Sequence, residues 1–250
     1  MADHWYHPDG TMESTDMRTA KKNGLFPSVT KILGLIGDDY SYWKEGRAIE
    51  AAVEHAQRTQ RVLTPEDVRV IRGHLDSEWH AIRETGNLVH QAMDYAVKNE
   101  DLPPVGHMAH MPHACWWRSV DAVGNVAFSS DPVFSERGIA CERLRLGGTL
   151  DMGGTCTHTC YIRYRPNGKR KQEVFSVRPG DRFLIDHKTQ RLGKDLRPSF
   201  DWKWAMQLAA YRRILGDGWE KAHCISHVVP VDCDVGSCWR VWSEEDLGQA

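Results

Sequence analysis

The periodicity of the apolar residues changes at about Val133, and this change limits the folds open to the chain. Before Val133, apolar residues recur every three or four positions, which is the spacing of one helix face. Helices are therefore predicted over about 41–57, from Thr64 to Ile82, and again around 89–96. After Val133, short β-prone runs alternate with turn residues, and a last helix is predicted over 199–215. This order of elements predicts an α/β protein.

No repeat or linker divides the sequence, so residues 1–250 are interpreted as a single domain. Its parts differ in composition. We expect a loose arm over 1–24, a mainly helical part over 25–130, and a sheet-containing core over 133–250.

Local signals place several boundaries. Strands are predicted over 134–146 and 148–152, and the Asn-Gly pair between two β-prone runs predicts a hairpin over 161–177. Ser28 is suited to cap a short helix. The run Thr64-Pro65-Glu66-Asp67 joins a capping hydroxyl, a proline at the first helical position and two acids, which is typical of a helix start.

The composition is that of an ordinary globular chain, with 41% hydrophobic and 26% charged residues. No apolar run approaches the roughly 20 residues of a membrane helix, and the first residues are too polar for a signal peptide. We therefore expect a cytoplasmic protein, or an intracellular one in an infected host, with no membrane partner. The net charge of −2 argues against a non-specific nucleic-acid coat, but not against an enzyme with a local basic track.

Two acidic residues follow apolar strands and are candidate metal ligands. Strand periodicity places Asp186 and Lys188 on one face and His187 on the other. Asp151 ends another predicted strand, and two carboxylates from neighbouring strand ends are the hard ligands that Mg²⁺ or Mn²⁺ prefers. A solvated ion pair between Asp186 and Lys188 is the simpler alternative.

Helical residues supply further candidates. Gln207 and Tyr211 are four residues apart and share a helix side, in a stretch where an unpaired amide would be costly. His90 follows Gly86 by one turn. A lone helical histidine is more often structural than catalytic.

Taken in order, these motifs resemble the RecB-type nucleases of the PD-(D/E)xK superfamily. The matching pieces run from about residue 25 to 230: Gly86-x-x-x-His90, Gly148-Thr149-Leu150-Asp151, Asp186-x-Lys188-Thr189 and Gln207-x-x-x-Tyr211. Pro27-Ser28-Val29-Thr30 and Trp43-Lys44 are further similar to exonucleases of the mitochondrial genome-maintenance and viral types.

The resemblance implies a restriction-endonuclease-like core, with a central mixed sheet flanked by helices, and metal-dependent hydrolysis of DNA. It implies that Asp151, Asp186, His90 and the backbone carbonyl of His187 bind Mg²⁺ or Mn²⁺. Lys188 would orient the attacking water and offset transition-state charge. Gln207 and Tyr211 would steady Lys188 or bind a phosphate, and Ser28 is expected to contact substrate. Glu142 is a weaker candidate for a second-metal ligand, with a solvent-facing charge as the alternative.

The sequence departs from the family pattern in two places. Asp186 follows Asp151 by 35 residues, a long gap that holds the predicted hairpin and its basic run, either a phosphate-contacting finger or a solvated loop. The basic residues of this run are Arg163, Arg165, Lys169, Arg170, Lys171 and Arg178. Some relatives hold an iron–sulfur cluster, but here no cysteine precedes His90, and we expect no cluster.

Other readings remain open. Two clusters have loose metal-ligand spacings for zinc: His107, His110 and His113 with Cys115, and Cys156 and Cys160 with His158. The leading expectation is an exonuclease acting on single-stranded DNA or free ends in replication, repair or recombination. The alternatives are a flap or junction endonuclease, and a nucleic-acid-binding module without catalysis.

Overall fold

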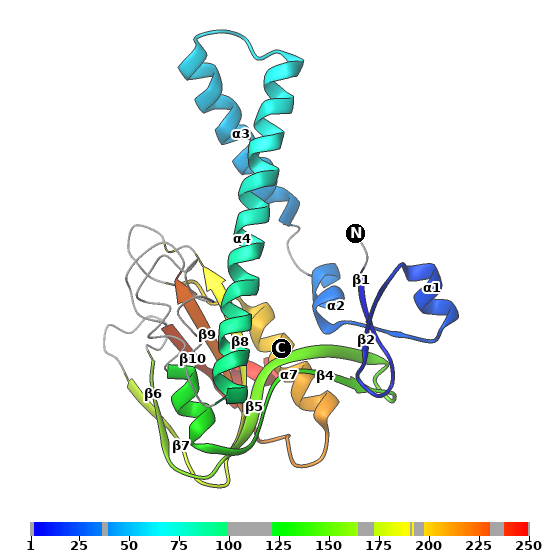
Figure 1. Ribbon diagram of the computed structural model, residues 1–250, viewed down its shortest axis with the longest axis vertical. Helices are drawn as coiled ribbons and strands as arrows, with labels where there is room; N and C mark the ends of the chain where they lie inside the picture. Colours follow the sequence, from blue (N-terminus) through cyan, green and yellow to red (C-terminus); the bar gives the residue numbers. More distant parts are fainter. Residues whose placement is uncertain are drawn as a thin grey trace.

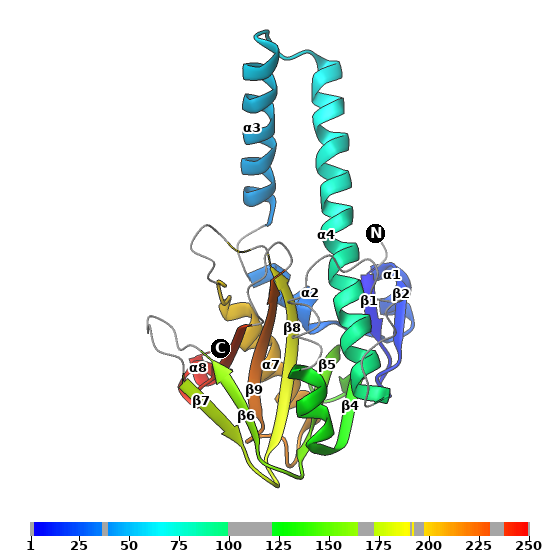
Figure 2. The ribbon, with the colours of Figure 1, turned by 60° about the vertical axis from the view of Figure 1, so that its left-hand side comes forward.

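The computed structural model describes residues 3–36, 40–99, 122–164, 173–190, 192, 198–230 and 238–249. A sheet with helices on both faces forms its body, and two helices project from this body as a long arm (Figures 1 and 2). The predicted α/β class is confirmed, because a mixed five-stranded sheet packs against helices and the N-terminal part holds a long helix.

The central sheet has the strand order β10-β9-β8-β5-β4. Its strands are β4 (Ser130–Cys141), β5 (Leu146–Cys156), β8 (Arg182–Gln190), β9 (His223–Pro230) and β10 (Cys238–Trp242). Strands β8 and β9 are parallel, and the other neighbours are antiparallel. The β5–β8 ladder ends at the pair Met152–Ile185, whereas β8 stays paired with β9 as far as Gln190. The sheet therefore opens between β5 and β8 just beyond Met152.

Each face of the sheet has its own apolar core. The C-terminal half of α4 (Pro65–Asn99) packs on one face, where Met93 joins a core that includes Ile185. On the other face, α7 (Trp202–Leu215) contributes Leu208 to a core with Leu184, which α8 (Glu244–Gln249) also joins. Side chains alternate across a strand, so the neighbours Leu184 and Ile185 serve opposite cores.

The projecting arm consists of α3 (Tyr40–Thr59) and the N-terminal half of α4 (Figure 2). The predicted helix start at Thr64 is confirmed. The Asp67 carboxylate accepts from the Thr64 amide and hydroxyl and from both terminal nitrogens of Arg61, at 2.6–2.8 Å, and lies 3.1 Å from His55 Nε2. These contacts tie the end of α3 to the beginning of α4.

The two helices predicted for 64–96 form a single 35-residue helix, α4. The glycine at position 86 does not break it, because α4 crosses β8 closely there. A Cβ at Gly86 would lie 3.4 Å from Thr189 Oγ1. This is an ordinary van der Waals distance, so position 86 of α4 packs directly on the strand that carries Asp186.

The loose arm expected over 1–24 is wrong. These residues form β1 (Asp3–Tyr6), β2 (Met12–Thr15) and α1 (Met17–Lys22), and β1 also pairs with β3 (Phe26–Pro27). The physical reason is a small apolar core of Trp5, Ala20 and Leu25, which is enough to order short and otherwise polar elements. The next helix, α2 (Val29–Ile36), begins at Ser28 as predicted, and the Ser28 hydroxyl accepts from the Lys31 amide.

The single strand predicted over 134–146 is also wrong. Residues 142–145 form a turn, and β4 and β5 on either side make one long hairpin. The predicted hairpin over 161–177 is confirmed in its arms, β6 (Cys160–Tyr164) and β7 (Glu173–Val177), which pair as a separate two-stranded sheet. Its tip lies outside the described residues.

Candidate metal centre

The site lies where β5 and β8 part. Asp151 and Asp186 occupy the register positions directly after the last pair of the ladder, Met152–Ile185. In place of a ladder bond, the His187 amide donates to Asp151 Oδ2 at 2.6 Å. Strand register alone therefore brings the two predicted acids opposite each other, although 35 residues separate them in the sequence.

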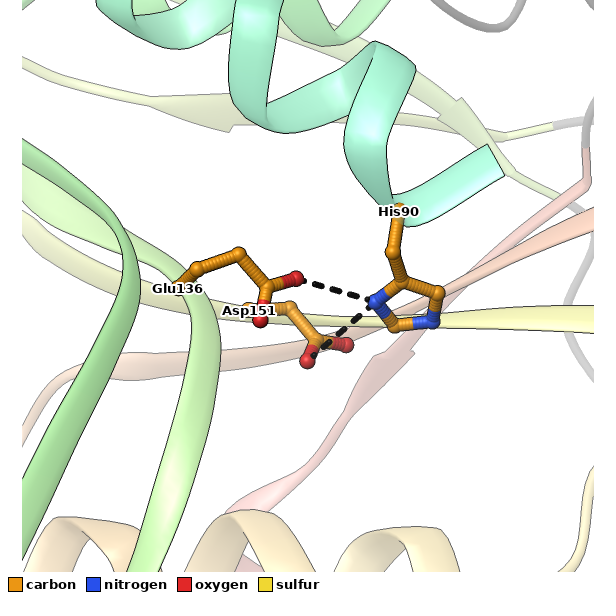
Figure 3. Close-up of side chains that lie close together, drawn as sticks. All are labelled: His90, Glu136 and Asp151. Carbon is orange, nitrogen blue, oxygen red and sulfur yellow. Dashed lines mark hydrogen bonds and ion pairs between the residues drawn. The ribbon is translucent and has the colours of Figure 1, made fainter. Parts of the chain in front are cut away.

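Three potential ligands from three elements converge beside this opening (Figure 3). His90 of α4, Glu136 of β4 and Asp151 of β5 place one ligand atom each within 4.8 Å of the others. The His90 Nδ1 atom lies 3.1 Å from Glu136 Oε1 and 3.6 Å from Asp151 Oδ1. Within the described part of the chain, no other three such side chains lie this close together, so Asp186 is outside this group of three.

The pKa values of Asp151 and His90 are both raised, as expected where acidic side chains lie close together. Burial, reinforced by the nearby charge of Asp186, raises the pKa of Asp151. Burial alone would lower the pKa of His90, but the hydrogen bond to Glu136 and the charges of Asp151 and Glu136 outweigh it and raise the pKa to about 8. A cation among these residues would relieve the repulsion between the acids.

Asp186 provides the clearest test of whether a metal fits. The residue is 1% exposed, and its Oδ1 atom accepts from Lys188 Nζ at 2.6 Å, which confirms that the two side chains share a face. Its Oδ2 atom is buried and has no hydrogen-bond partner. A buried carboxylate oxygen without a partner is costly. Hard oxygen atoms with a single imidazole suit Mg²⁺ or Mn²⁺, so the residues present fit such an ion.

Gln207 and Tyr211 lie behind the acids, on the α7 side of the sheet. Both are buried, and the Gln207 amide donates to the Tyr211 hydroxyl at 3.0 Å. Burial, with added repulsion from Asp186 and Asp151, raises the pKa of Tyr211 well above its usual value. The Tyr211 ring packs against Gly148 so closely that a Cβ at position 148 would lie only 2.5 Å from the ring. The glycine thus permits this close approach, and the predicted roles of the pair stay predictions.

The His187 side chain points away from Asp186 into a buried pair with His227. Their Nδ1 atoms lie 3.0 Å apart, and the His227 ring stacks on Trp239. Burial lowers the pKa of both imidazoles, that of His227 to about 3. The amide of His187 is the group that contacts Asp151, and the metal-binding role of its carbonyl remains a prediction.

Of the expected substrate-binding residues, the structure describes Ser28 and Arg163, and neither belongs to this group. Ser28 is buried at the start of α2, where its hydroxyl serves the helix, and its substrate contact stays a prediction. Arg163 is exposed on β6. Arg165, Lys169, Arg170 and Lys171 lie outside the described residues, so their role also stays a prediction.

Sequence reasoning missed Glu136. The turn was expected after Leu146, so Glu142 was named as the acid on the strand before Asp151, but Glu142 is exposed in the turn. With the turn at 142–145, the pairs Ser135–Met152 and Arg137–Leu150 place Glu136 opposite Asp151. The Glu136 backbone has φ 45°, a strained conformation of the kind that persists at functional sites. Hairpin register was the signal that would have found it.

The zinc alternatives gain no support. Cys156, Cys160 and His158 do not gather into a three-ligand group among the described residues, and burial raises the pKa of both thiols. His107, His110 and His113 lie outside the described residues.

No helix in the described ranges combines the length and the apolar character needed to cross a membrane. When the chain is compared with protein-family models and with curated proteins, neither comparison finds a match.

Proposed function

We propose that this protein is a Mg²⁺- or Mn²⁺-dependent DNA exonuclease that hydrolyses phosphodiester bonds on single strands or at free ends. One observation carries the proposal: Asp151 and Asp186 occupy opposing register positions where β5 and β8 part, with Lys188 bonded to Asp186. Glu136 and His90 border the same opening. This donor set suits a hard divalent cation and a phosphoryl substrate.

Each residue has a chemical task in this proposal. Asp151, Asp186, Glu136 and His90 would hold the cation. When bound, a divalent cation polarises a phosphoryl oxygen and makes a water molecule more acidic. The Lys188 side chain is 25% exposed, and its ammonium would orient the attacking water and offset the charge that develops on the phosphate.

The access to the centre is consistent with a large substrate. The side chains of His90 and Glu136 are 30% and 33% exposed, whereas Asp151 and Asp186 are buried. A phosphate would therefore approach from the side of His90 and Glu136. A protein that only binds DNA has no use for a buried carboxylate oxygen that lacks a partner, which disfavours the non-catalytic alternative.

The test is cleavage of end-labelled linear and closed circular single-stranded DNA by the purified chain, with Mg²⁺, Mn²⁺ or EDTA. Asp186→Asn is the inactive variant. Asp76→Asn is the matched control, because it makes the same chemical change at an exposed acid on the arm. We expect wild type and Asp76→Asn to degrade linear DNA only with metal, and Asp186→Asn to leave it intact.

The substrates separate the alternatives. Cleavage of the circle as well as the linear strand would indicate an endonuclease, and preference for flaps or junctions would define its class. Metal-independent cleavage, or unchanged cleavage by Asp186→Asn, would reject the metal centre as the active site.

A further inference from the structure

We infer that residues 3–28, here called the N-terminal clamp, hold the β4–β5 hairpin at the spacing that lets Glu136 and Asp151 share a cation, with Tyr6 as the positioning residue. The inference rests on the proposed metal centre. It gives a role in metal binding to a segment that carries no ligand itself.

Tyr6 is a buried contact of the clamp with β5. It is 3% exposed, and its hydroxyl lies 3.0 Å from Thr149 Oγ1. Its ring covers Gly147, where a Cβ would overlap the Tyr6 side chain, so glycine is needed for this approach. Ser28 forms an isolated β-bridge with Gly147 as well. The clamp thus contacts β5 at positions 147 and 149, just before Asp151.

The clamp contacts β4 through a second close approach. Gly10 has φ +88°, and a Cβ there would lie 2.6 Å from the Gly138 carbonyl oxygen. Any side chain at Gly138 would likewise overlap the backbone of Gly10. No larger residue at either position would preserve this contact.

The two contacts meet at one point of the hairpin. Gly138 and Thr149 are register partners in the β4–β5 ladder. Glu136 and Asp151 are the next positions on the same sides of the two strands, about 7 Å further along. A clamp that fixes the Gly138–Thr149 pair therefore also fixes the neighbouring acids. In agreement, burial and the charge of Glu136 both raise the pKa of the Tyr6 phenol.

The clamp is rigid enough for this task. Trp5, Ala20 and Leu25 form its own apolar core, and β1 pairs with both β2 and β3. Lys31 of α2 lies over the Trp5 ring at 4.1 Å and pairs with Asp3, which ties the clamp to the body. Two acids that repel each other need such outside support to stay close before a cation arrives.

The experiment compares Mn²⁺ binding by calorimetry in wild type, Tyr6→Phe, Gly10→Ala and Gly24→Ala. Gly24 is the matched control, because it also has a positive φ, +70°, in the same segment, but a Cβ there meets nothing within 4 Å. Thermal melting of each variant without metal measures its structural cost, and the Mn²⁺ concentration for half-maximal DNA cleavage is a second readout.

We expect Tyr6→Phe to weaken Mn²⁺ binding about threefold to tenfold, near or below the effect of losing a group bonded directly to a ligand. Gly10→Ala should weaken binding at least as much, and Gly24→Ala should bind as wild type does even if it melts earlier. A purely structural role would lower melting temperatures and leave Mn²⁺ binding unchanged.

The outcomes separate this inference from the proposed function. Wild-type Mn²⁺ affinity in both Tyr6→Phe and Gly10→Ala, or equal weakening in Gly24→Ala, overturns the clamp even if the protein cleaves DNA. Weakened binding in the two clamp variants supports it even if no DNA substrate is cleaved. A wild-type protein that binds no Mn²⁺ overturns both.

Discussion

Two buried carboxylates, Asp67 at the tip of the arm and Asp186 in the sheet, differ in how far their oxygens are hydrogen-bonded. The Asp67 carboxylate at the tip accepts hydrogen bonds from Arg61 and Thr64. Asp186 in the sheet has one oxygen on Lys188 and the other buried without a partner. Both residues are less than a tenth exposed, so burial alone does not distinguish them.

The difference separates a structural acid from a functional one. The bonds from Thr64, together with Arg61, lower the pKa of Asp67, which means that the folded state favours its charge. At the sheet opening, burial and the charge of Asp186 raise the pKa of Asp151, which means that the fold holds this acid at a cost. Polar groups that the fold leaves unsatisfied are candidates for ligand binding.

The largest expected effect is the loss of cleavage in Asp186→Asn. Removal of the charge removes a metal ligand, and we expect at least a roughly 10³-fold decrease in kcat/KM, the upper range for losing one transition-state contact. Folding should not suffer, because repulsion with Asp151 also disappears. Initial rates and melting curves test both parts. A variant that melts much earlier than wild type would place Asp186 with the structural acids.

Lys188→Met should have a comparable effect on the rate, with a different signature. The charge that offsets the transition state is lost, so kcat should decrease about 10²- to 10³-fold. Mn²⁺ binding should persist, because Asp186 then offers both oxygens to the ion. Calorimetry beside single-turnover rates tests this. Loss of Mn²⁺ binding together with cleavage would assign Lys188 to the assembly of the site instead of the chemistry.

Divalent metal should stabilise the sheet opening and leave the arm tip unaffected. At a Mn²⁺ concentration 100 times its dissociation constant, binding adds about 2.7 kcal/mol to the free energy of unfolding. For a chain of this size that raises Tm by roughly 5–10 °C. Wild type and Asp67→Asn should show the same increase, and Asp186→Asn almost none. An increase that survives in Asp186→Asn would point to a metal site elsewhere.

Asp67→Asn should lower stability and spare cleavage. The folded pKa of Asp67 lies below its ordinary value of 3.8, so the carboxylate stabilises the fold above about pH 4. This contribution disappears as the pH falls through the folded pKa. The urea midpoints of wild type and variant should therefore differ by a constant amount from pH 7 to about pH 5 and converge below. A constant difference at every pH would contradict the assignment.

The smallest expected effect concerns Arg163 on β6. If this exposed side chain contacts one DNA phosphate, Arg163→Gln should flatten the log–log salt dependence of binding by about 0.7. Arg213→Gln, an exposed change on α7, is the control and should leave the slope as it is. Cleavage at saturating DNA should stay unchanged in both variants. An unaltered slope in Arg163→Gln would show that Arg163 of β6 does not contact a DNA phosphate.

Sequence reasoning located the acids and the lysine because strand alternation and strand ends are local properties. The face shared by Asp186 and Lys188 follows from periodicity alone. Glu136 was not found because its place depends on the register of a hairpin whose turn was expected after Leu146 but lies at 142–145, and register comes from tertiary packing.

The N-terminal clamp was missed for a related reason. Its strands are short and mostly polar, and only Trp5 and Tyr6 are buried in β1. What orders them is contact with distant residues, such as Tyr6 with Thr149, 143 positions away. The continuity of α4 through Gly86 was equally hidden, because packing on β8 overrides the low helix propensity of glycine.

Anomalous diffraction from crystals of the wild-type protein soaked in Mn²⁺ tests the central claim most directly. The account predicts a manganese peak between Asp151 and Asp186 at the β5–β8 opening, within bonding distance of Glu136 or His90, and no peak there in Asp186→Asn crystals. A wild-type crystal with no peak at this opening, or with its peak at another group of residues, would contradict the account.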